Sequence, residues 1–309
     1  MHDIDVSIVL PVFNEEGHIV EEIDRIRTAM DRSDYSYEVI VVDDGSTDRT
    51  PDLVHNVPGI RFVRFDQNRG SGSSRRAGTR LARGTVVVWT DADMSYPNDQ
   101  IPQLVDQLPG WDQVVGARRS EEGTNKALRV PAKWFIRKLA SYLSDTMIPD
   151  LNSGFRAFRR DVGEQFLHQL PKGFSCVTTL TMTFLNNGYS VRYVPIVYAK
   201  RAGQSKFHWW RDTRLYLLQV VRMMLLYNPL RVFMPVALVG TVGAIAKLIF
   251  DLVTKDFRVA TNTIVWLGAA ISLMLVALLS DLVVNLNRDK NHVLPASAYS
   301  SGFDDPPTL

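Results

Sequence analysis

Two long apolar stretches near the C-terminus constrain the fold of this 309-residue chain more than any other feature. Residues 232–253 read VFMPVALVGTVGAIAKLIFDLV, and residues 263–286 read TIVWLGAAISLMLVALLSDLVVNL. A helix of either length spans about 30 Å, the thickness of a bilayer's hydrocarbon core. The alternative is two buried helices of a soluble core, but soluble helices of this length normally keep a polar face. We therefore predict a transmembrane helical hairpin over residues 232–286.

Because a hairpin returns the chain to the side it started from, the residues before and after it lie on the same side of the membrane, and these residues carry most of the nearby positive charges. Arg288 and Lys290 follow it, while only Lys255 and Arg258 lie in its short connector. The arginines that precede it are Arg211, Arg214, Arg222 and Arg231. The positive-inside bias predicts a multi-pass protein of the cell (inner) membrane, with the N-terminal domain and the flexible tail 287–309 in the cytoplasm. The two helices also offer a surface through which the chain could form a homo-oligomer.

Residues 211–231 are expected to form an amphipathic helix. On a helical wheel Arg211, Arg214, Gln219 and Arg222 share one face, while Leu, Val and Met fill the remainder. Such a helix is suited to lie in the membrane interface. The alternative is a helix packed against its own domain.

Residues 1–210 alternate between apolar β-branched runs and helical patterns. The runs VSIVLPVF, YEVIVVDDG and TVVVWTDAD are predicted strands, and EEGHIVEEIDRIRTAM is a predicted helix. This alternation predicts an α/β domain with a mostly parallel sheet covered on both faces. Ligands of such sheets bind beyond the carboxyl ends of the strands.

Carboxylates gather at those strand ends, in PVFNEE, DDGSTD and TDADM. A cleft with this much negative charge suits a divalent cation, and a divalent cation suits a phosphate. No GxGxxG follows the first strand and no GxxxxGK[ST] is present, so neither a dinucleotide site nor a P-loop is predicted. The net charge of +2 gives no indication of nucleic-acid binding.

Six motifs occur in an order and spacing that resemble family 2 glycosyltransferases: PVFNEE, VVDDGSTDRT, NRGSGSSRRAG, TDADMSYP, VGARR and SGFRAFRRD. With the membrane hairpin, the chain most resembles the polyprenyl-phosphate glycosyltransferases, which include dolichyl-phosphate mannose synthases. The likeness covers about residues 6–206. It implies a GT-A (Rossmann-like) fold that transfers a hexose, with inversion, from a UDP- or GDP-linked sugar to a polyprenyl phosphate.

The resemblance implies a donor site at the strand ends. The residues matched to nucleotide-sugar binding are Pro11, Phe13, Glu15, Asp43, Asp44, Asp91, Ala92 and Asp93. Asp91 and Asp93 match the DxD pair, expected to hold Mg²⁺ or Mn²⁺ on the donor diphosphate. Ser95 stands where many relatives have glutamine and is the third candidate metal ligand. The alternatives are that Asp43 and Asp44 cap the following helix, and that Asp91 and Asp93 only form a turn.

The resemblance also implies a set of mostly cationic residues that bind the acceptor phosphate and take part in catalysis. The expected catalytic set is Asp93, Arg118, Asp150, Arg137 and Lys206, and the expected acceptor-phosphate set is Arg137, Lys200, Arg201 and Lys206. Arg137 is preferred over Arg129, and the choice between Lys200 and Arg201 stays open. Asp150 is expected to act either as a weak base or as a brace for a cation.

Other residues and functions are weighed against these. Arg156, Arg159 and Arg160 are equally well explained as a solvated basic face, and Cys176 is expected to be a small buried residue. A processive polysaccharide synthase is one rival function, but only QVVRM approaches the Q-x-x-R-W motif of that class. A catalytically inactive membrane scaffold of the same fold is the other. The sequence leaves the sugar and its nucleotide open.

Overall fold

The computed structural model describes residues 4–118, 147–173, 175–199, 218, 221, 225, 229–254 and 259–288. The described residues fall into two compact units, 4–199 and 218–288, which we treat separately. Of the predicted amphipathic helix 211–231, all but a few positions lie outside the described residues.

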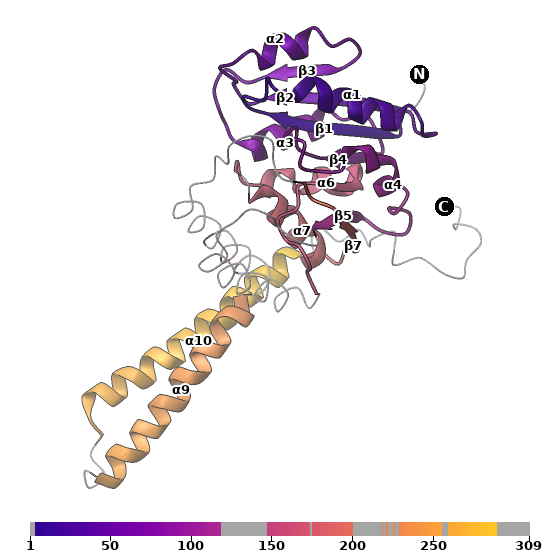
Figure 1. The fold of residues 1–309 in the computed structure, drawn as a ribbon. Coiled ribbons are helices and arrows are strands. Elements are labelled where there is room, and N and C mark those ends of the chain that lie inside the picture. The colour runs from indigo at the N-terminus through magenta and orange to yellow at the C-terminus, as the bar shows by residue number, and fades with distance from the viewer. Residues whose placement is uncertain are drawn as a thin grey trace, which may run out of the picture. The chain divides into compact units, whose positions relative to one another are not determined.

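A seven-stranded sheet forms the centre of the first unit, in the order β3-β2-β1-β4-β6-β5-β7 (Figure 1). The strands are β1 (Val6–Val12), β2 (Tyr37–Asp43), β3 (Arg61–Arg64), β4 (Val86–Trp89), β5 (Gln113–Arg118), β6 (Arg156–Arg159) and β7 (Val191–Ile196). Only β6 runs antiparallel to its neighbours, β4 and β5. The predicted mostly parallel sheet is therefore confirmed.

Helices cover both faces of this sheet. They are α1 (Ile19–Met30), α2 (Thr50–His55), α3 (Ser71–Leu81), η1 (Asn98–Gln100), α4 (Ile101–Val105), α6 (Arg160–Phe166), η2 (Leu167–Gln169) and α7 (Cys176–Asn186). One hydrophobic core includes residues of α1, α2 and α4, and the other includes residues of α6 and α7. Successive side chains of a strand point to opposite faces, so Ile8 and Leu10 of β1 enter the first core while Val9 enters the second.

The strand order places a switch point between β1 and β4. From β1 the chain runs outward to β2 and β3, then returns to pair β4 with the other side of β1. Because β6 is antiparallel to both β4 and β5, the carboxyl ends of β1, β2, β4 and β5 lie at the same edge of the sheet. Open α/β sheets bind ligands at such a point.

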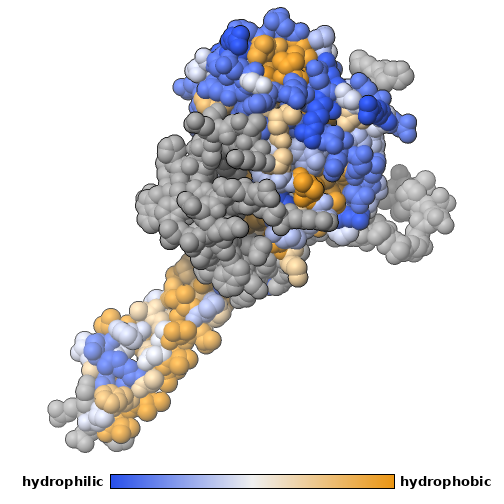
Figure 2. Space-filling view, viewed as in Figure 1, coloured by the Kyte–Doolittle hydropathy of each residue, from blue (hydrophilic) through white to orange (hydrophobic). Residues whose placement is uncertain are grey.

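The second unit contains two helices, α9 (Pro229–Thr254) and α10 (Thr261–Arg288), each long and apolar enough to cross a membrane. The side chains that they expose are mostly hydrophobic (Figure 2). The predicted helical hairpin is confirmed.

Buried positions along the hairpin recur every seven residues, at Ala237, Ala244 and Asp251 on α9 and at Thr263, Ala270 and Ala277 on α10. A seven-residue repeat of small side chains allows two membrane helices to pack closely. At the connector the Thr263 hydroxyl donates a hydrogen bond to Asp251 Oδ2. Lys247 Nζ lies 3.9 Å from the other oxygen, Oδ1, so both sides of a carboxylate that would be costly to leave unpaired in a bilayer have a polar neighbour.

Candidate active site

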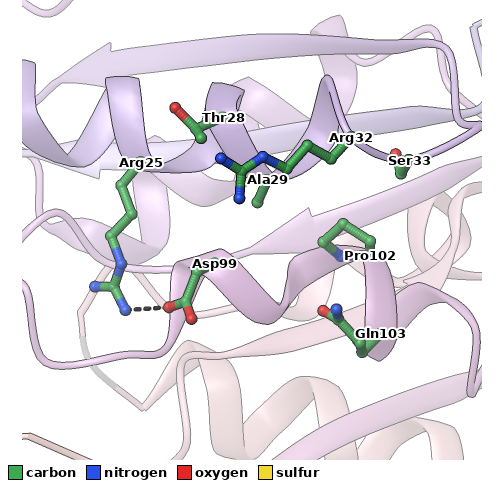
Figure 3. A pocket seen from close by; sticks show the side chains of 8 residues that line it. All are labelled: Arg25, Thr28, Ala29, Arg32, Ser33, Asp99, Pro102 and Gln103. Carbon is green, nitrogen blue, oxygen red and sulfur yellow. Dashed lines mark hydrogen bonds and ion pairs between the residues drawn. The ribbon is translucent and has the colours of Figure 1, made fainter.

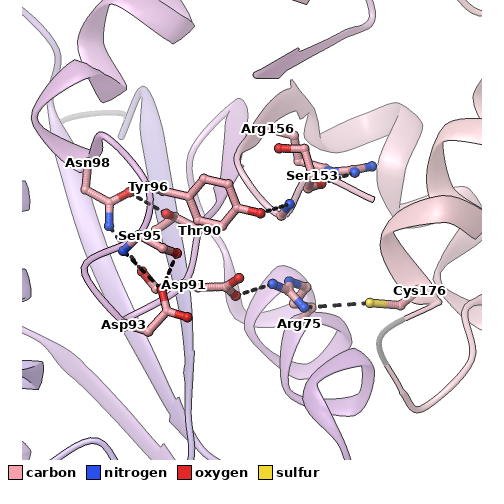
Figure 4. Close-up of polar contacts among 11 residues, drawn as sticks. Arg75, Thr90, Asp91, Asp93, Ser95, Tyr96, Asn98, Ser153, Arg156 and Cys176 are labelled. Atoms are coloured by element: carbon pink, nitrogen blue, oxygen red, sulfur yellow. Dashed lines mark hydrogen bonds and ion pairs between the residues drawn. The ribbon is translucent and has the colours of Figure 1, made fainter. Parts of the chain in front are cut away.

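The loop after β4 presents the predicted DxD pair (Figure 4). Ser95 donates two hydrogen bonds to Asp93 Oδ1, one from its backbone N–H at 3.2 Å and one from its hydroxyl. Asp93 and Ser95 are both buried, and Met94 between them has a left-handed φ of 62°. In this structure Ser95 therefore orients Asp93 within a tight turn.

A buried amide fixes this loop to α1. Asn98 Nδ2 donates to Glu22 Oε1 at 2.7 Å and to the Asp91 carbonyl at 3.2 Å, while the Thr90 hydroxyl donates to Asn98 Oδ1. Burial raises the pKa of Glu22, although the Asn98 amide and the Arg25 charge oppose that rise. Sequence reasoning missed both Glu22 and Asn98. The available signal was an acidic residue within the apolar stripe of α1, between Ile19 and Met30.

A buried arginine contacts the first DxD carboxylate. Arg75 of α3 donates from Nη2 to Asp91 Oδ1 at 2.5 Å. Sequence reasoning used the surrounding NRGSGSSRRAG only as one of the six family motifs and missed this residue. Two adjacent arginines at positions 75 and 76 gave no local indication of which one would turn inward.

The loops after β1 and β2 are joined by short polar contacts. Asn14, with a φ of 54°, donates its N–H to Ser46 Oγ at 2.9 Å and accepts the Thr47 N–H at 2.8 Å. The Glu15 N–H donates to Thr50 Oγ1 at 2.9 Å. The predicted residues Pro11 and Phe13 lie at this end of β1, so these contacts position them at the carboxyl edge.

Asp43 ends β2 and is fully buried. Its Oδ1 accepts the Ser46 N–H at 3.0 Å, and Arg64 Nε lies 3.2 Å from its Oδ2. The neighbouring helix α2 has no side-chain cap. The structure therefore does not support the alternative in which Asp43 only caps that helix.

Asp44 holds the glycine-rich loop before α3. It accepts the backbone N–H groups of Arg69 at 2.7 Å and Gly70 at 2.8 Å. Gly70 has a φ of 90°, and a Cβ there would lie 2.4 Å from the Lys172 carbonyl oxygen. The Gly72 N–H donates to that same oxygen at 2.8 Å, so the glycines serve close packing against Lys172.

Arg118 and Asp150, predicted separately, form one ion pair. Arg118 Nε lies 2.7 Å from Asp150 Oδ2 and Nη2 lies 2.9 Å from Oδ1, and the guanidinium carbon lies 5.2 Å from the centre of the Tyr198 ring. Burial alone would raise the pKa of Asp150, but its hydrogen bonds and charge interaction with Arg118 lower it below its ordinary value. An ionised, paired carboxylate is a weak base, so the geometry favours the role of a brace.

The explanation of Arg156 as part of a solvated face is wrong. Arg156 is fully buried and donates to the carbonyl oxygens of Ser153 and Val177, the latter at 2.7 Å. It stands on β6, and neutral acceptors take up its donors. Arg159 and Arg160 are partly exposed and form ion pairs at the surface. Cys176 is buried, as predicted.

A cavity of about 420 Å³ lies between α1 and the η1–α4 segment (Figure 3). Its lining residues are Arg25, Thr28, Ala29, Arg32, Ser33, Asp99, Pro102 and Gln103. Arg25 forms an ion pair with Asp99 across it. None of the predicted site residues that the structure describes lines this cavity, so we do not assign the chemistry to it.

The acceptor-side predictions fall largely on other parts of the chain. Arg137, Lys200, Arg201 and Lys206 lie outside the described residues. Within the described residues, no group of three or more His, Cys, Asp or Glu side chains could hold a metal ion. A divalent cation at Asp91 and Asp93 would therefore need further oxygen ligands, as a diphosphate provides.

Comparison with known families decides the kind of protein. The family model described as glycosyl transferase family 2 matches residues 7–167, more than half of the chain, from the second residue of β1 to the first residue of η2. The chain belongs to glycosyl transferase family 2. A second model, described as the GtrB C-terminal hairpin, matches residues 228–286, which include most of α9 and α10. The resemblance inferred from the motifs is confirmed, and the apolar hairpin identifies a membrane protein.

The names of similar curated proteins describe transferases that act on polyprenyl phosphates. An undecaprenyl-phosphate 4-deoxy-4-formamido-L-arabinose transferase of Pseudomonas aeruginosa is 29% identical over 272 residues, which cover 85% of this chain and 76% of the relative. A dolichyl-phosphate hexose transferase of Haloferax volcanii is 31% identical over 207 residues, covering 65% of this chain and 86% of the relative. The match to a transferase of Aeromonas hydrophila spans 62% of that protein's length.

Solved structures of other proteins have a similar fold. The glucosyl-3-phosphoglycerate synthase of Mycobacterium tuberculosis, solved with Mn²⁺, UDP and glucosyl-3-phosphoglycerate, aligns with a TM-score of 0.58 at 24% identity. The alignment covers 71% of this chain and 79% of the synthase. This likeness confirms the predicted GT-A-like fold of the glycosyltransferase.

Proposed function

We propose that this glycosyltransferase moves a hexose from a UDP- or GDP-linked sugar to a polyprenyl phosphate, with inversion at the transferred carbon. The observation that carries the proposal is the position of Asp91 and Asp93 at the carboxyl edge of a family 2 domain whose chain also contains the GtrB hairpin. The names of the Pseudomonas and Haloferax relatives support a polyprenyl-phosphate acceptor.

The donor side is built around the DxD loop. Asp91 and Asp93 would hold Mg²⁺ or Mn²⁺, with Ser95 orienting Asp93 and available as a third ligand. When bound, the cation would stabilise the negative charge that develops on the leaving diphosphate. Asn98 and Glu22 keep the loop in place. The remaining candidates near the nucleotide lie at the ends of β1 and β2, in the loops that follow them and in the DxD turn: Pro11, Phe13, Glu15, Asp43, Asp44 and Ala92.

The acceptor side needs alignment more than proton removal. A polyprenyl phosphate is already an anion near neutral pH, so its oxygen can attack without a strong general base. Asp150, ionised and held by Arg118, fixes the direction of that guanidinium. Lys206, Arg137 and one of Lys200 or Arg201 are the residues that would bind the lipid phosphate, by charge-assisted hydrogen bonds.

The proposal includes an orientation in the membrane. The positive charges that flank the hairpin favour a cytoplasmic position for the catalytic domain and the C-terminus. Protease treatment of right-side-out and inverted vesicles tests this, because only inverted vesicles would expose the domain to cleavage. Cleavage of the domain in intact right-side-out vesicles would show that the orientation is the opposite of the one proposed.

The decisive experiment presents labelled UDP-glucose, UDP-galactose and GDP-mannose to the purified protein with undecaprenyl or dolichyl phosphate. We expect one donor to give a lipid-linked monosaccharide. The matched control is the polyprenol without its phosphate, which should give no product. A lengthening polysaccharide would indicate the processive class, and metal-dependent nucleotide binding with no transfer from any donor would indicate an inactive scaffold.

A further inference from the structure

Arg75 joins a buried positive charge to a partly exposed carboxylate of the DxD loop. Its side chain is 2% exposed, whereas that of Asp91 is 27% exposed, and Nη2 of the arginine lies 2.5 Å from Oδ1 of the aspartate (Figure 4). The guanidinium therefore approaches Asp91 from the protein interior. A ligand at the carboxyl edge would approach from the solvent side.

The surroundings of Arg75 keep this arrangement in place. Its guanidinium carbon lies 5.7 Å from the centre of the Trp89 ring, and its Nη1 lies 3.9 Å from Cys176 Sγ. A Cβ at Gly154 would lie 3.0 Å from Asp91 Oδ2 and 3.1 Å from Arg75 Nη2. The absence of a side chain at Gly154 thus leaves the room that the ion pair occupies.

A second buried cation adds to the positive charge on this side of the loop. Arg156 is fully buried, and among the described residues its donors meet only neutral acceptors. The pKa of Arg156 is lowered to about 10, chiefly by burial and in part by the charge of Arg75. The two interior guanidinium groups thus interact with each other, and Arg75, which contacts Asp91, opposes the binding of a cation there.

We propose that Arg75 is a positioning residue that holds Asp91 and competes with the divalent cation for its carboxylate, so that the cation binds tightly only together with the donor diphosphate. This inference rests on the proposed function. Arg75 offsets one of the two DxD charges, and two carboxylates supply fewer oxygens than Mg²⁺ or Mn²⁺ requires. A nucleoside diphosphate adds both the missing oxygens and the missing negative charge.

Direct measurement of Mn²⁺ binding tests the proposal without relying on turnover. The electron paramagnetic resonance signal of free Mn²⁺ is titrated against the full chain in detergent, alone, with UDP and with GDP. For Arg75→Met we expect roughly tenfold tighter Mn²⁺ binding in the absence of nucleotide, and a correspondingly smaller gain on adding nucleotide. In transfer assays the same variant should show a lower KM for Mn²⁺ together with a lower kcat, because Asp91 is no longer held.

Arg76→Met is the matched control. Arg76 is the next residue of α3 and donates to the Leu170 carbonyl at 3.1 Å, so its removal should leave Mn²⁺ binding unchanged. Arg75→Lys keeps the charge and should retain the weak wild-type affinity. If Arg75→Met does not fold, as judged by its thermal unfolding, Arg75→Gln provides the neutral side chain instead, with the same expected result.

The outcomes separate this inference from the proposed function. Mn²⁺ binding by the neutral variant that is no tighter than wild type, or weaker, would overturn the competition and leave Arg75 as a structural brace. Absence of nucleotide-dependent Mn²⁺ binding in the wild-type protein would overturn the proposed metal–nucleotide site itself, and the competition with it.

Discussion

Arg118 and Asp150 meet through two parallel hydrogen bonds, from Nε to Oδ2 at 2.7 Å and from Nη2 to Oδ1 at 2.9 Å. The Arg118 backbone N–H also donates to Asp150 Oδ2 at 3.2 Å. This fork-to-fork geometry fixes both the position and the plane of the guanidinium at the end of β5. Two residues that were predicted to act separately therefore behave as one unit.

The pair makes a prediction about pH and stability. The folded-state pKa of Asp150 lies below its ordinary value of 3.8, so the ion pair stabilises the fold above about that pH. The contribution is lost as the pH falls through the folded value. Asp150→Asn should lower the free energy of unfolding by about 2–3 kcal/mol at pH 7 and flatten the acid limb of the stability curve. Urea unfolding of both proteins across this range checks the result; parallel curves would contradict it.

Removal of a DxD carboxylate should abolish most transfer. Asp93→Asn is expected to cost about 3 kcal/mol of transition-state stabilisation, which corresponds to about 100-fold in rate. EDTA treatment of the wild-type protein should have a comparable effect. Asp99→Asn, which changes an exposed carboxylate of η1, is the control and should retain activity. Turnover by Asp93→Asn within a fewfold of wild type would exclude the metal role.

Asn98 should matter for the stability of the DxD loop although it carries no charge. In Asn98→Ala, the buried Glu22 loses its 2.7 Å donor and the Asp91 carbonyl loses a donor at 3.2 Å. We expect a loss of about 2–3 kcal/mol in the free energy of unfolding, because buried polar groups without partners are costly. Urea denaturation measures this. A variant as stable as wild type would show that water or a neighbouring group replaces the amide.

Acceptor binding should depend on Lys206. Lys206→Ala is expected to raise KM for polyprenyl phosphate and depress transfer strongly at subsaturating acceptor, since a charge-assisted hydrogen bond contributes about 1.5–3 kcal/mol. The variant should still sediment with membranes and still bind nucleotide. Lys172→Ala, which changes an exposed lysine, is the control. Near-normal turnover by Lys206→Ala would place the lipid phosphate elsewhere.

The product should have the opposite anomeric configuration to the donor. A single displacement by the phosphate oxygen inverts the sugar carbon, so an α-linked nucleotide sugar should give a β-linked lipid phosphate. Proton and carbon NMR of the isolated product distinguishes the two. An α-linked product would show retention of configuration and would exclude a single inverting displacement.

Features that depend on neighbours along the chain could be predicted from the sequence. The burial of β1 on both faces of the sheet, the apolar length of α9 and α10, and the carboxylates directly after β4 each depend on local pattern, and the structure confirms the first two. The six motifs in order indicated the family before any fold was known. Even there, α1 begins at Ile19 rather than at the predicted Glu15, because the preceding residues turn back toward the loop after β2.

Contacts between distant segments were decided only by the tertiary structure. Glu22 and Asn98 are 76 residues apart, and Arg75 and Asp91 are brought together by the order in which β1 and β4 pair. Arg156 appeared to belong to a basic surface run until β6 was seen to enter the sheet between β4 and β5, which buries it. The spacing of apolar residues along the chain indicates which side chains are buried. The partner of a buried charge, in contrast, is set by the order of the strands and by helix packing, and these depend on contacts across the whole domain.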